Sequence, residues 1–390
     1  MARKLFGLIL ISAVLAFGAV QTGAFAEGEK TVNDIIEELK LFSKTLGIIE
    51  EAYVNDVKAR DLYYEAVKGM LAALDKYCEF FGPDKYPLLK IYMKGEYAGI
   101  GIILFTRDNY PAVRSVQPGS AAEKAGLFQN DKILKIDGKS MEGQKNEDVS
   151  ALLRGDADAP VTLTLMRDGL PKEMDITIKR EKIELPAVKD ATMPAKSIGY
   201  FHIVDFQEHT GAQVDEAMKK LSKENLKALI IDLRGNGGGL LPQAVNLAEH
   251  FLPEGKKIVS VKSKIKEQQK VYFSSGKKQL PDYPLVVLID GQSASASEIF
   301  SACMQDYHRA TIMGVKSYGK ASVQSVIPLD DQSAMKITTA RYLSPLDRSI
   351  DGIGIQPDIV VEKQGDVDTP LLEAVGFLQK TLEKNNQNNK

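Results

Sequence analysis

The 390-residue sequence has no tryptophan, two cysteines and four histidines. The two cysteines, Cys78 and Cys303, are too few for a disulfide framework. Cys303 lies in an apolar helical pattern, which favours a buried free thiol. The histidines show no metal-ligand spacing and no aspartate or glutamate stands near them in a known pattern, so neither a zinc site nor a histidine-based triad is indicated. We therefore predict a protein that needs no metal and no cofactor.

The chain also lacks an excess of either charge. It has 50 basic and 52 acidic residues, a formal net charge of −2, and therefore no global basic field that would attract nucleic acid or anionic lipid. Hydrophobic residues make up 44% of the sequence and charged residues 26%, which is typical of a soluble globular protein. A chain of this length has room for two or three domains.

One long apolar run stands at the N-terminus. Arg3 and Lys4 precede the almost purely apolar residues 5–19, and Ala24 and Ala26 form a small-x-small cleavage pattern. This layout predicts a secretory signal peptide over residues 1–26 and hence a periplasmic or otherwise exported protein. The alternative is an uncleaved membrane anchor, which would make the protein membrane-associated, although the run is somewhat short for a span.

The remaining sequence changes character three times. Residues 27–90 have the spacing of amphipathic helices, and residues 91–180 hold short β-like runs separated by turn residues. Residues 181–364 alternate apolar strands with helices, which indicates a layered α/β domain. Residues 365–390 are expected to form a helix followed by a disordered Asn/Gln/Lys tail. The terminal helices each have an apolar face that needs cover, which favours a homodimer.

Ser295 is the first candidate for chemistry. It follows the apolar run 285–289 at the start of a helix expected over residues 295–307, and with Glu298 it has the S-x-x-E spacing of a capping box. A serine in that position is either a simple helix cap or a nucleophile whose oxyanion the free amides of the first turn stabilise. Ser293 and Ser297 alternate with it, and local physics does not choose among the three.

A serine nucleophile needs a base, and Lys320 is the candidate. It lies between a glycine turn and small or apolar residues, so burial would lower its pKa and leave a neutral amine. An ordinary surface lysine is the alternative. A third element, residues 230–239, is an apolar strand followed by a glycine-rich turn without the P-loop pattern. Its glycines would let backbone amides approach an oxyanion or a substrate backbone.

Together these motifs resemble the C-terminal processing peptidases, or tail-specific proteases, of the S41 class. The resemblance selects Ser295 as nucleophile, from the serine followed by Ala-Ser-Glu, and Lys320 as base, from Tyr-Gly-Lys-Ala. It implies that Gln324 orients Lys320, and that Gly238 and the amide of Ala296 form the oxyanion hole. Gly237 stands where the family usually has proline, and Ala321 stands where it usually has glycine. Neither change removes Ser295, Lys320 or Gln324.

The β-rich region resembles a PDZ domain. Residues 97–102 are similar to the carboxylate-binding loop of such domains, and residues 117–126 and 131–138 match further parts of the module. A PDZ groove binds a peptide as an added strand, and its loop amides hold the terminal carboxylate. The resemblance implies peptide binding by Gly99, Ile100, Gly101 and Ile102, although Gly99 and Gly101 could simply make a tight turn.

We therefore expect a multi-domain α/β protein with a helical N-terminal segment, a PDZ module and a ClpP/crotonase-like core. The resemblance implies an exported serine endopeptidase with a Ser-Lys dyad, which acts on proteins or peptides with free C-termini. An activating adaptor protein is a further expected partner, and the PDZ module could gate the active site. Two alternatives are a catalytically silent PDZ scaffold and an acyl-CoA enzyme of the crotonase type.

Overall fold

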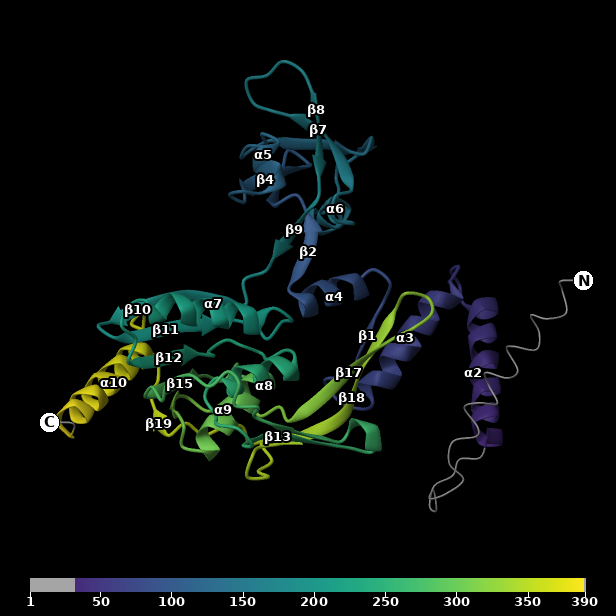
Figure 1. Ribbon diagram of the computed structural model, residues 1–390. Coiled ribbons are helices and arrows are strands. Elements are labelled where there is room, and N and C mark those ends of the chain that lie inside the picture. Colours follow the sequence, from purple (N-terminus) through teal and green to yellow (C-terminus); the bar gives the residue numbers. More distant parts are fainter. Residues whose placement is uncertain (1–31, 389–390) are drawn as a thin grey trace, which may run out of the picture. The chain divides into compact units, whose positions relative to one another are not determined.

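The computed structural model describes residues 32–388, and the chain divides into two units, residues 1–73 and 74–390 (Figure 1). The predicted signal peptide lies outside the described residues. The first unit holds α2 (Val32–Ala52) and α3 (Ala59–Ala72). Many large apolar side chains of these helices are exposed: Ile35, Ile36, Leu39, Leu41, Phe42, Ile48, Ile49, Tyr63 and Met70. Within residues 32–388, no helix combines the length and apolarity needed to cross a bilayer.

The second unit contains a six-stranded sheet that carries the candidate catalytic turns. Its strand order is β10 (Val188–Ala195), β11 (Ile198–Ile203), β12 (Ala228–Asp232), β15 (Leu285–Ile289), β16 (Thr311–Gly314) and β19 (Ile359–Val360). All pairs are parallel except β10 with β11. Every residue of β12 and β15 is buried. Unbroken apolar runs of this kind are typical of parallel strands whose two faces are both covered.

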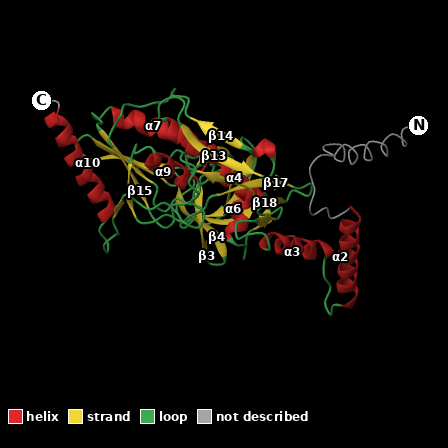
Figure 2. Cartoon of the chain, turned by 90° about the horizontal axis from the view of Figure 1, so that it is seen from below, coloured by secondary structure: helices red, strands yellow, loops and turns green. Residues whose placement is uncertain are grey.

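Helices cover both faces of this sheet (Figure 2). Alternate residues of a strand point to opposite faces, so Ile231 and Val287 pack with α7 (Thr210–Ser222), α8 (Leu241–Glu249) and α9 (Ala296–Asp306). Their neighbours Ile230 and Val286 pack with α10 (Thr369–Asn388), drawn in yellow in Figure 1. The result is a three-layer arrangement, which agrees with the layered α/β domain that the sequence predicts.

A second sheet flanks the catalytic turns. Its order is β1 (Glu79–Phe81), β18 (Ala334–Leu343), β13 (Lys257–Ser263) and β14 (Lys270–Phe273), and β17 (Ser322–Pro328) also pairs with β18. Strand β1 comes from residues that the sequence analysis assigned to a helical domain over 27–90. The helical assignment is wrong for β1, and residues 74–90 lie in the second unit; residues 86–90 are helical as predicted, within α4 (Tyr86–Lys94).

The β-rich module is a third sheet. It runs β3 (Ile102–Arg107), β4 (Tyr110–Val116), β5 (Lys132–Ile136), β7 (Pro160–Met166) and β8 (Met174–Lys179), with β6 (Lys139–Ser140) beside β5. Helices α5 (Ala121–Lys124) and α6 (Asn146–Leu153) close its core, in which Val113, Ile133 and Leu163 are fully buried. Strands β2 (Glu96–Gly99) and β9 (Glu181–Glu184) pair where the chain enters and leaves the module.

Most predicted elements are present, and the differences from the sequence-based expectation fall in a few segments. The alternation of apolar strands and helices predicted over residues 181–364 is present, for example in the succession of β11, α7 and β12. Strands β10, β13 and β14 were not predicted, because their mixed polar sequences follow neither helical nor strand periodicity cleanly. The predicted C-terminal helix continues to Asn388, so residues 383–388 of the expected disordered tail are helical.

Candidate active site

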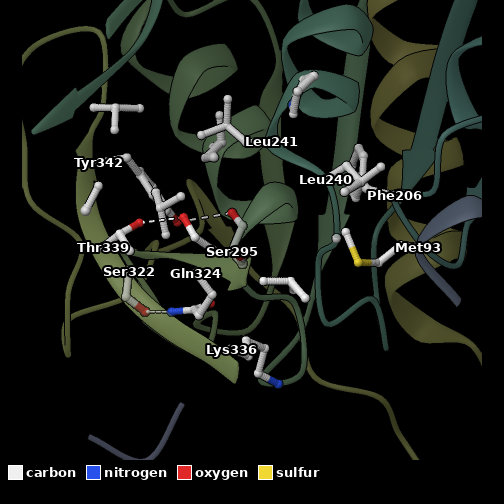
Figure 3. A pocket seen from close by; sticks show the side chains of 18 of the residues that line it. Met93, Phe206, Leu240, Leu241, Ser295, Ser322, Gln324, Lys336, Thr339 and Tyr342 are labelled. Atoms are coloured by element: carbon white, nitrogen blue, oxygen red, sulfur yellow. Dashed lines mark hydrogen bonds between the residues drawn. The ribbon is translucent and has the colours of Figure 1, made fainter. Parts of the chain in front are cut away.

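Ser295, Lys320 and Gln324 line one cavity of about 630 Å³. Ser295 stands at the start of α9, Lys320 in the loop before β17, and Gln324 in β17 itself. The opposite wall is apolar and includes Met93 of α4 and Phe206 (Figure 3). The cavity therefore combines a nucleophile candidate, a cationic side chain and an apolar surface that could bind substrate.

Ser295 has a strained backbone. Its φ is +54° and its ψ is −112°, a region that residues with a side chain rarely adopt. The chain turns sharply there between β15 and α9, and the turn leaves Ser295 on the cavity wall. Strain of this kind costs about 1–3 kcal/mol and persists where the surrounding structure imposes it, most often at functional sites.

The structure distinguishes the three alternating serines. The Ser293 hydroxyl donates to the carbonyl of Leu233 at 2.8 Å, and the Ser297 hydroxyl donates to the carbonyl of Asn236 at 3.0 Å. Both side chains are fully buried, whereas Ser295 is half-buried and faces the cavity. The geometry therefore favours Ser295 on physical grounds, which the sequence pattern alone did not supply.

The glycine-rich turn after β12 packs against Ser295. A Cβ at Gly238 would lie 2.8 Å from Cβ of Ser295 and 2.7 Å from the carbonyl oxygen of Ala294, and the φ of Gly238 is +105°. Only glycine therefore fits there. The Gly238 amide, however, donates to Oδ1 of Asn236 at 2.8 Å. Ala296 is the first residue of α9, so its amide has no acceptor within the helix and is the better placed oxyanion donor.

Glu298 connects the two candidate catalytic residues. Its side chain is fully buried, and its Oε2 accepts hydrogen bonds from the amides of Ser295 (2.9 Å) and Lys320 (2.8 Å). Its Oε1 accepts from the Ser317 hydroxyl (2.5 Å) and the Gly319 amide (2.7 Å). One carboxylate thus fixes both the turn that carries the nucleophile and the loop that carries the lysine. The predicted S-x-x-E spacing indicated only the first of these roles.

Tyr342 of β18 provides a second connection. Its hydroxyl donates toward the carbonyl oxygens of Ser295 at 3.1 Å and Lys320 at 2.7 Å. The side chain is almost fully buried, and burial raises the pKa of its phenol, so it remains a donor. The sequence analysis assigned this residue no role, because its partners are 47 and 22 positions away.

Lys320 has the electrostatic environment that the sequence analysis required. Burial lowers the pKa of its amine below the ordinary value, and the nearby cation of Lys336 lowers it further. The hydroxyl of Tyr318 and the carboxylates of Asp75 and Glu298 oppose this shift. A lowered lysine pKa increases the fraction of neutral amine that can accept a proton.

Gln324 lines the cavity, but its amide contacts other groups. Among the described residues, its Nε2 donates to the hydroxyls of Ser322 at 2.8 Å and Thr338 at 3.2 Å, and no hydrogen bond joins Lys320 Nζ to its Oε1. Ser322 and Gln324 lie together on one side of the cavity in Figure 3. The predicted orienting contact between Gln324 and Lys320 is therefore not formed in this structure.

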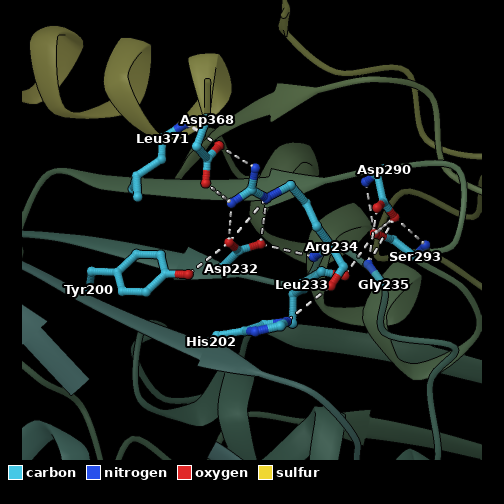
Figure 4. A network of polar contacts seen from close by, with 10 residues as sticks. All are labelled: Tyr200, His202, Asp232, Leu233, Arg234, Gly235, Asp290, Ser293, Asp368 and Leu371. Carbon is cyan, nitrogen blue, oxygen red and sulfur yellow. Dashed lines mark hydrogen bonds and ion pairs between the residues drawn. The ribbon is translucent and has the colours of Figure 1, made fainter. Parts of the chain in front are cut away.

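A polar network behind the glycine turn holds it in place (Figure 4). Arg234 forms ion pairs with Asp232 at the end of β12 and with Asp368 before α10. Asp290, at the end of β15, accepts from the Gly235 amide at 3.0 Å. These contacts tie the turn to two neighbouring strands and to the C-terminal helix, so a segment distant in sequence stabilises the candidate oxyanion region.

The predicted peptide-binding loop of the β-rich module lines its own small cavity. Gly99, Ile100, Gly101 and Ile102 face α6 across a space of about 50 Å³. Gly101 has a φ of +84°, and a Cβ there would lie 2.4 Å from Cβ of Ser120. This glycine is required by the close approach of the chain, as well as by the turn.

Two family models match the chain. Residues 197–361 match peptidase family S41, and residues 112–167 match the PDZ domain. The S41 match spans β12, α9 and the Lys320 loop, so it contains all the candidate catalytic residues. The PDZ match lies within the β-rich module.

Curated relatives agree with these matches. A carboxy-terminal-processing protease from Bartonella bacilliformis is 39% identical over 332 residues, which covers 84% of this chain and 76% of that protein. A CtpA-like serine protease from Staphylococcus saprophyticus is 32% identical over 91% of this chain and 72% of its own length. Among solved structures, a photosystem II D1 C-terminal processing protease aligns with 83% of this chain and 93% of its own at 29% identity, with a TM-score of 0.46.

Proposed function

The chain belongs to peptidase family S41 and carries a PDZ domain, and from this premise we propose that it is a serine endopeptidase that uses Ser295 and Lys320 as a catalytic dyad. The observation that carries the proposal is the shared cavity. It brings a half-buried serine at a helix N-terminus together with a lysine whose pKa is lowered by burial.

In the first step, the neutral Lys320 amine accepts the proton of the Ser295 hydroxyl while Oγ attacks the peptide carbonyl carbon. The carbonyl π electrons move to oxygen, and the amide of Ala296 and the positive end of the α9 dipole stabilise the resulting oxyanion. Gly238 could contribute a second donor only after its amide leaves Asn236.

In the second step, the Lys320 ammonium returns the proton to the leaving amine nitrogen as the C–N bond breaks. An ester between Ser295 and the N-terminal product remains. Water then attacks this ester with Lys320 again as the base, and the serine is released. The apolar side of the cavity, including Met93 and Phe206, would hold substrate side chains close to Ser295.

The PDZ module would select the substrate by its C-terminus. The loop of Gly99 to Ile102 offers backbone amides for a terminal carboxylate, and the adjoining cavity has space for a small apolar side chain. The substrate class is then proteins or peptides with an accessible, unstructured C-terminus. This proposal is supported by the PDZ match and by the position of the glycine loop beside α6.

The proposed setting of the enzyme follows from the sequence. The N-terminal segment 1–26 supports export to the periplasm or beyond, where an adaptor protein could activate the enzyme. Exposed apolar side chains on α2, such as Leu39 and Phe42, support homodimer formation through the N-terminal helices. A comparison of the mass in solution of the mature protein and of a Leu39→Lys, Phe42→Lys variant tests the dimer.

The proposal is tested by digestion of an unfolded protein and of matched peptides with a free or an amidated C-terminus, with the products identified by mass spectrometry. We expect cleavage by the parent protein, faster cleavage of the free C-terminus, and no cleavage by Ser295→Ala or Lys320→Ala. Equal cleavage of the two peptides would contradict recognition of the C-terminus but not the catalytic dyad. Unchanged cleavage by either variant would contradict the dyad.

A further inference from the structure

Residues 75–81, which precede the PDZ domain, pack against the strands of the active site. Strand β1 pairs with β18, with Glu79 opposite Lys336. The sulfur of Cys78 accepts a hydrogen bond from the amide of Thr338 at 3.4 Å, and Nζ of Lys76 donates to the Tyr318 hydroxyl at 2.8 Å. The segment is therefore attached both to the sheet beside Gln324 and to the loop that carries Lys320.

Tyr77 of this segment faces the amine of Lys320. The Lys320 Nζ lies 4.8 Å from the centroid of the Tyr77 ring, which is within the range of a cation–π contact. The backbone of Tyr77 is held in turn, since its amide donates to Oδ1 of Asp75 at 2.8 Å. Among the described residues, no hydrogen bond from Lys320 Nζ accompanies this contact, and Nζ of Lys76 also lies near the ring, 5.1 Å from its centroid.

An aromatic face attracts an ammonium ion and has no comparable attraction for a neutral amine. The other groups that face the Lys320 amine act in both directions. The cation of Lys336 in β18 disfavours the charged form of the amine. Three groups favour the charged form: Tyr318 in the Lys320 loop, Asp75 before β1, and Glu298 in α9. The ring of Tyr77 adds to the second set and also restricts where the side chain can lie.

We propose that Tyr77 is a positioning residue for the catalytic base: its ring holds the Lys320 side chain beside the cavity and favours the ammonium form, so that it controls how much neutral amine is available to Ser295. The inference rests on the proposed role of Lys320 as base. It also assigns a function to residues 75–81, which neither the S41 match nor the PDZ match includes.

The direct test measures the protonation of Lys320 without catalysis. In the full chain with Ser295→Ala, the rate of Lys320 acetylation by acetic anhydride is followed against pH by mass spectrometry of the Lys320 peptide. Tyr77→Phe keeps the ring but removes the hydroxyl that interacts with Tyr318 and Lys76, so it is the reference variant. Relative to it, Tyr77→Leu, which removes the ring, should lower the Lys320 pKa by about 0.4–1.5 units. An equal pKa in the two variants, or a rise in Tyr77→Leu, overturns the proposal.

A graded series guards against misfolding of the leucine variant. Phenylalanine analogues with one, two or three ring fluorines at position 77 keep the shape of the ring and progressively weaken the attraction of its face for a cation. The Lys320 pKa should fall stepwise with fluorination. A pKa that does not depend on fluorination refutes the cation–π role even if Tyr77→Leu does not fold.

Catalysis provides the second readout. In the Ser295 enzyme, the acid limb of the pH profile of kcat/KM should move to lower pH in Tyr77→Leu by the same amount as the labelling pKa. A purely structural role predicts instead an equal loss at every pH with no shift, which would overturn the proposal. Failure of the dyad itself is distinguishable, because Ser295→Ala or Lys320→Ala would then still cleave while the labelling result stands.

Discussion

Replacement of Glu298 by glutamine should damage both the stability of the core and the alignment of the dyad. The carboxylate is fully buried and accepts four hydrogen bonds, from the amides of Ser295, Gly319 and Lys320 and from the Ser317 hydroxyl. A glutamine has one oxygen that can accept and one NH₂ group that cannot. Its best orientation places the oxygen toward the amides of Ser295 and Lys320.

The NH₂ group then faces Ser317, whose hydroxyl can turn to accept, and Gly319, whose amide can only donate. One buried donor is left unpaired, which costs about 1–3 kcal/mol, and loss of the negative charge weakens the three remaining bonds. With an m-value of about 2 kcal/mol/M, a loss of about 2 kcal/mol lowers the urea midpoint by about 1 M. Displacement of the nucleophile or base by about 1 Å can cost ~10²-fold in rate.

The assay pairs urea unfolding with cleavage of a peptide substrate, and Glu216→Gln on the exposed side of α7 is the matched control. The control should stay within about 0.5 kcal/mol of the parent protein. If Glu298→Gln has the parental midpoint and the parental kcat/KM, the carboxylate does not organise the site as described here.

Three further predictions concern single positions. Gly238→Ala should reduce cleavage and the unfolding midpoint, because its Cβ would overlap Ser295. Gly237→Ala, whose added Cβ would have no atom within 4 Å, should keep the midpoint. Equal midpoints for the two variants would contradict the close packing of Gly238 against Ser295. In the Ser295→Ala chain, Gly101→Ala should weaken binding of a C-terminal peptide, measured by calorimetry. Gly119→Ala is the control, because Gly119 has a similar positive φ but no atom within 4 Å of an added Cβ. Equal peptide binding by the two variants would argue against the loop contact. The pKa of Lys320 is lowered in the folded protein, so between that pKa and the usual ~10.4 the unfolded state binds more protons than the folded state. The free energy of unfolding should therefore rise with pH across this window, when compared with that of Lys320→Met. A difference that falls or stays flat would contradict the burial of the amine.

Much of the fold was predictable because its signals are local. The buried strands β12 and β15 are short apolar runs between turn residues, and α9 begins at a recognisable capping pattern. Strand β1 was predicted as part of a helical segment, because it is stabilised by pairing with β18, some 250 residues later in the chain. No periodicity within a three-residue strand can indicate such a partner.

The candidate site shows the same division. The sequence indicated Ser295, Lys320 and Gly238 through motifs, and the structure brings them together. The family resemblance selected Ser295 over its neighbours, but a physical reason for that choice required burial and hydrogen bonds, which depend on the tertiary packing of the glycine turn. The roles of Tyr77 and Tyr342 were missed because each acts from a segment that is distant in sequence from the residues it contacts.

The central claim is that Ser295 and Lys320 act as one chemical unit, and the most direct test is a double-mutant comparison. Initial rates of cleavage of one peptide are measured for the parent protein, Ser295→Ala, Lys320→Ala and the double variant, with Lys316→Met, an exposed lysine earlier in the same loop, as the control. The account predicts that both single variants fall to the background rate and that the double variant is no worse, as for residues that function together, while Lys316→Met remains active. Substantial cleavage by Ser295→Ala, or losses that multiply in the double variant, would contradict it.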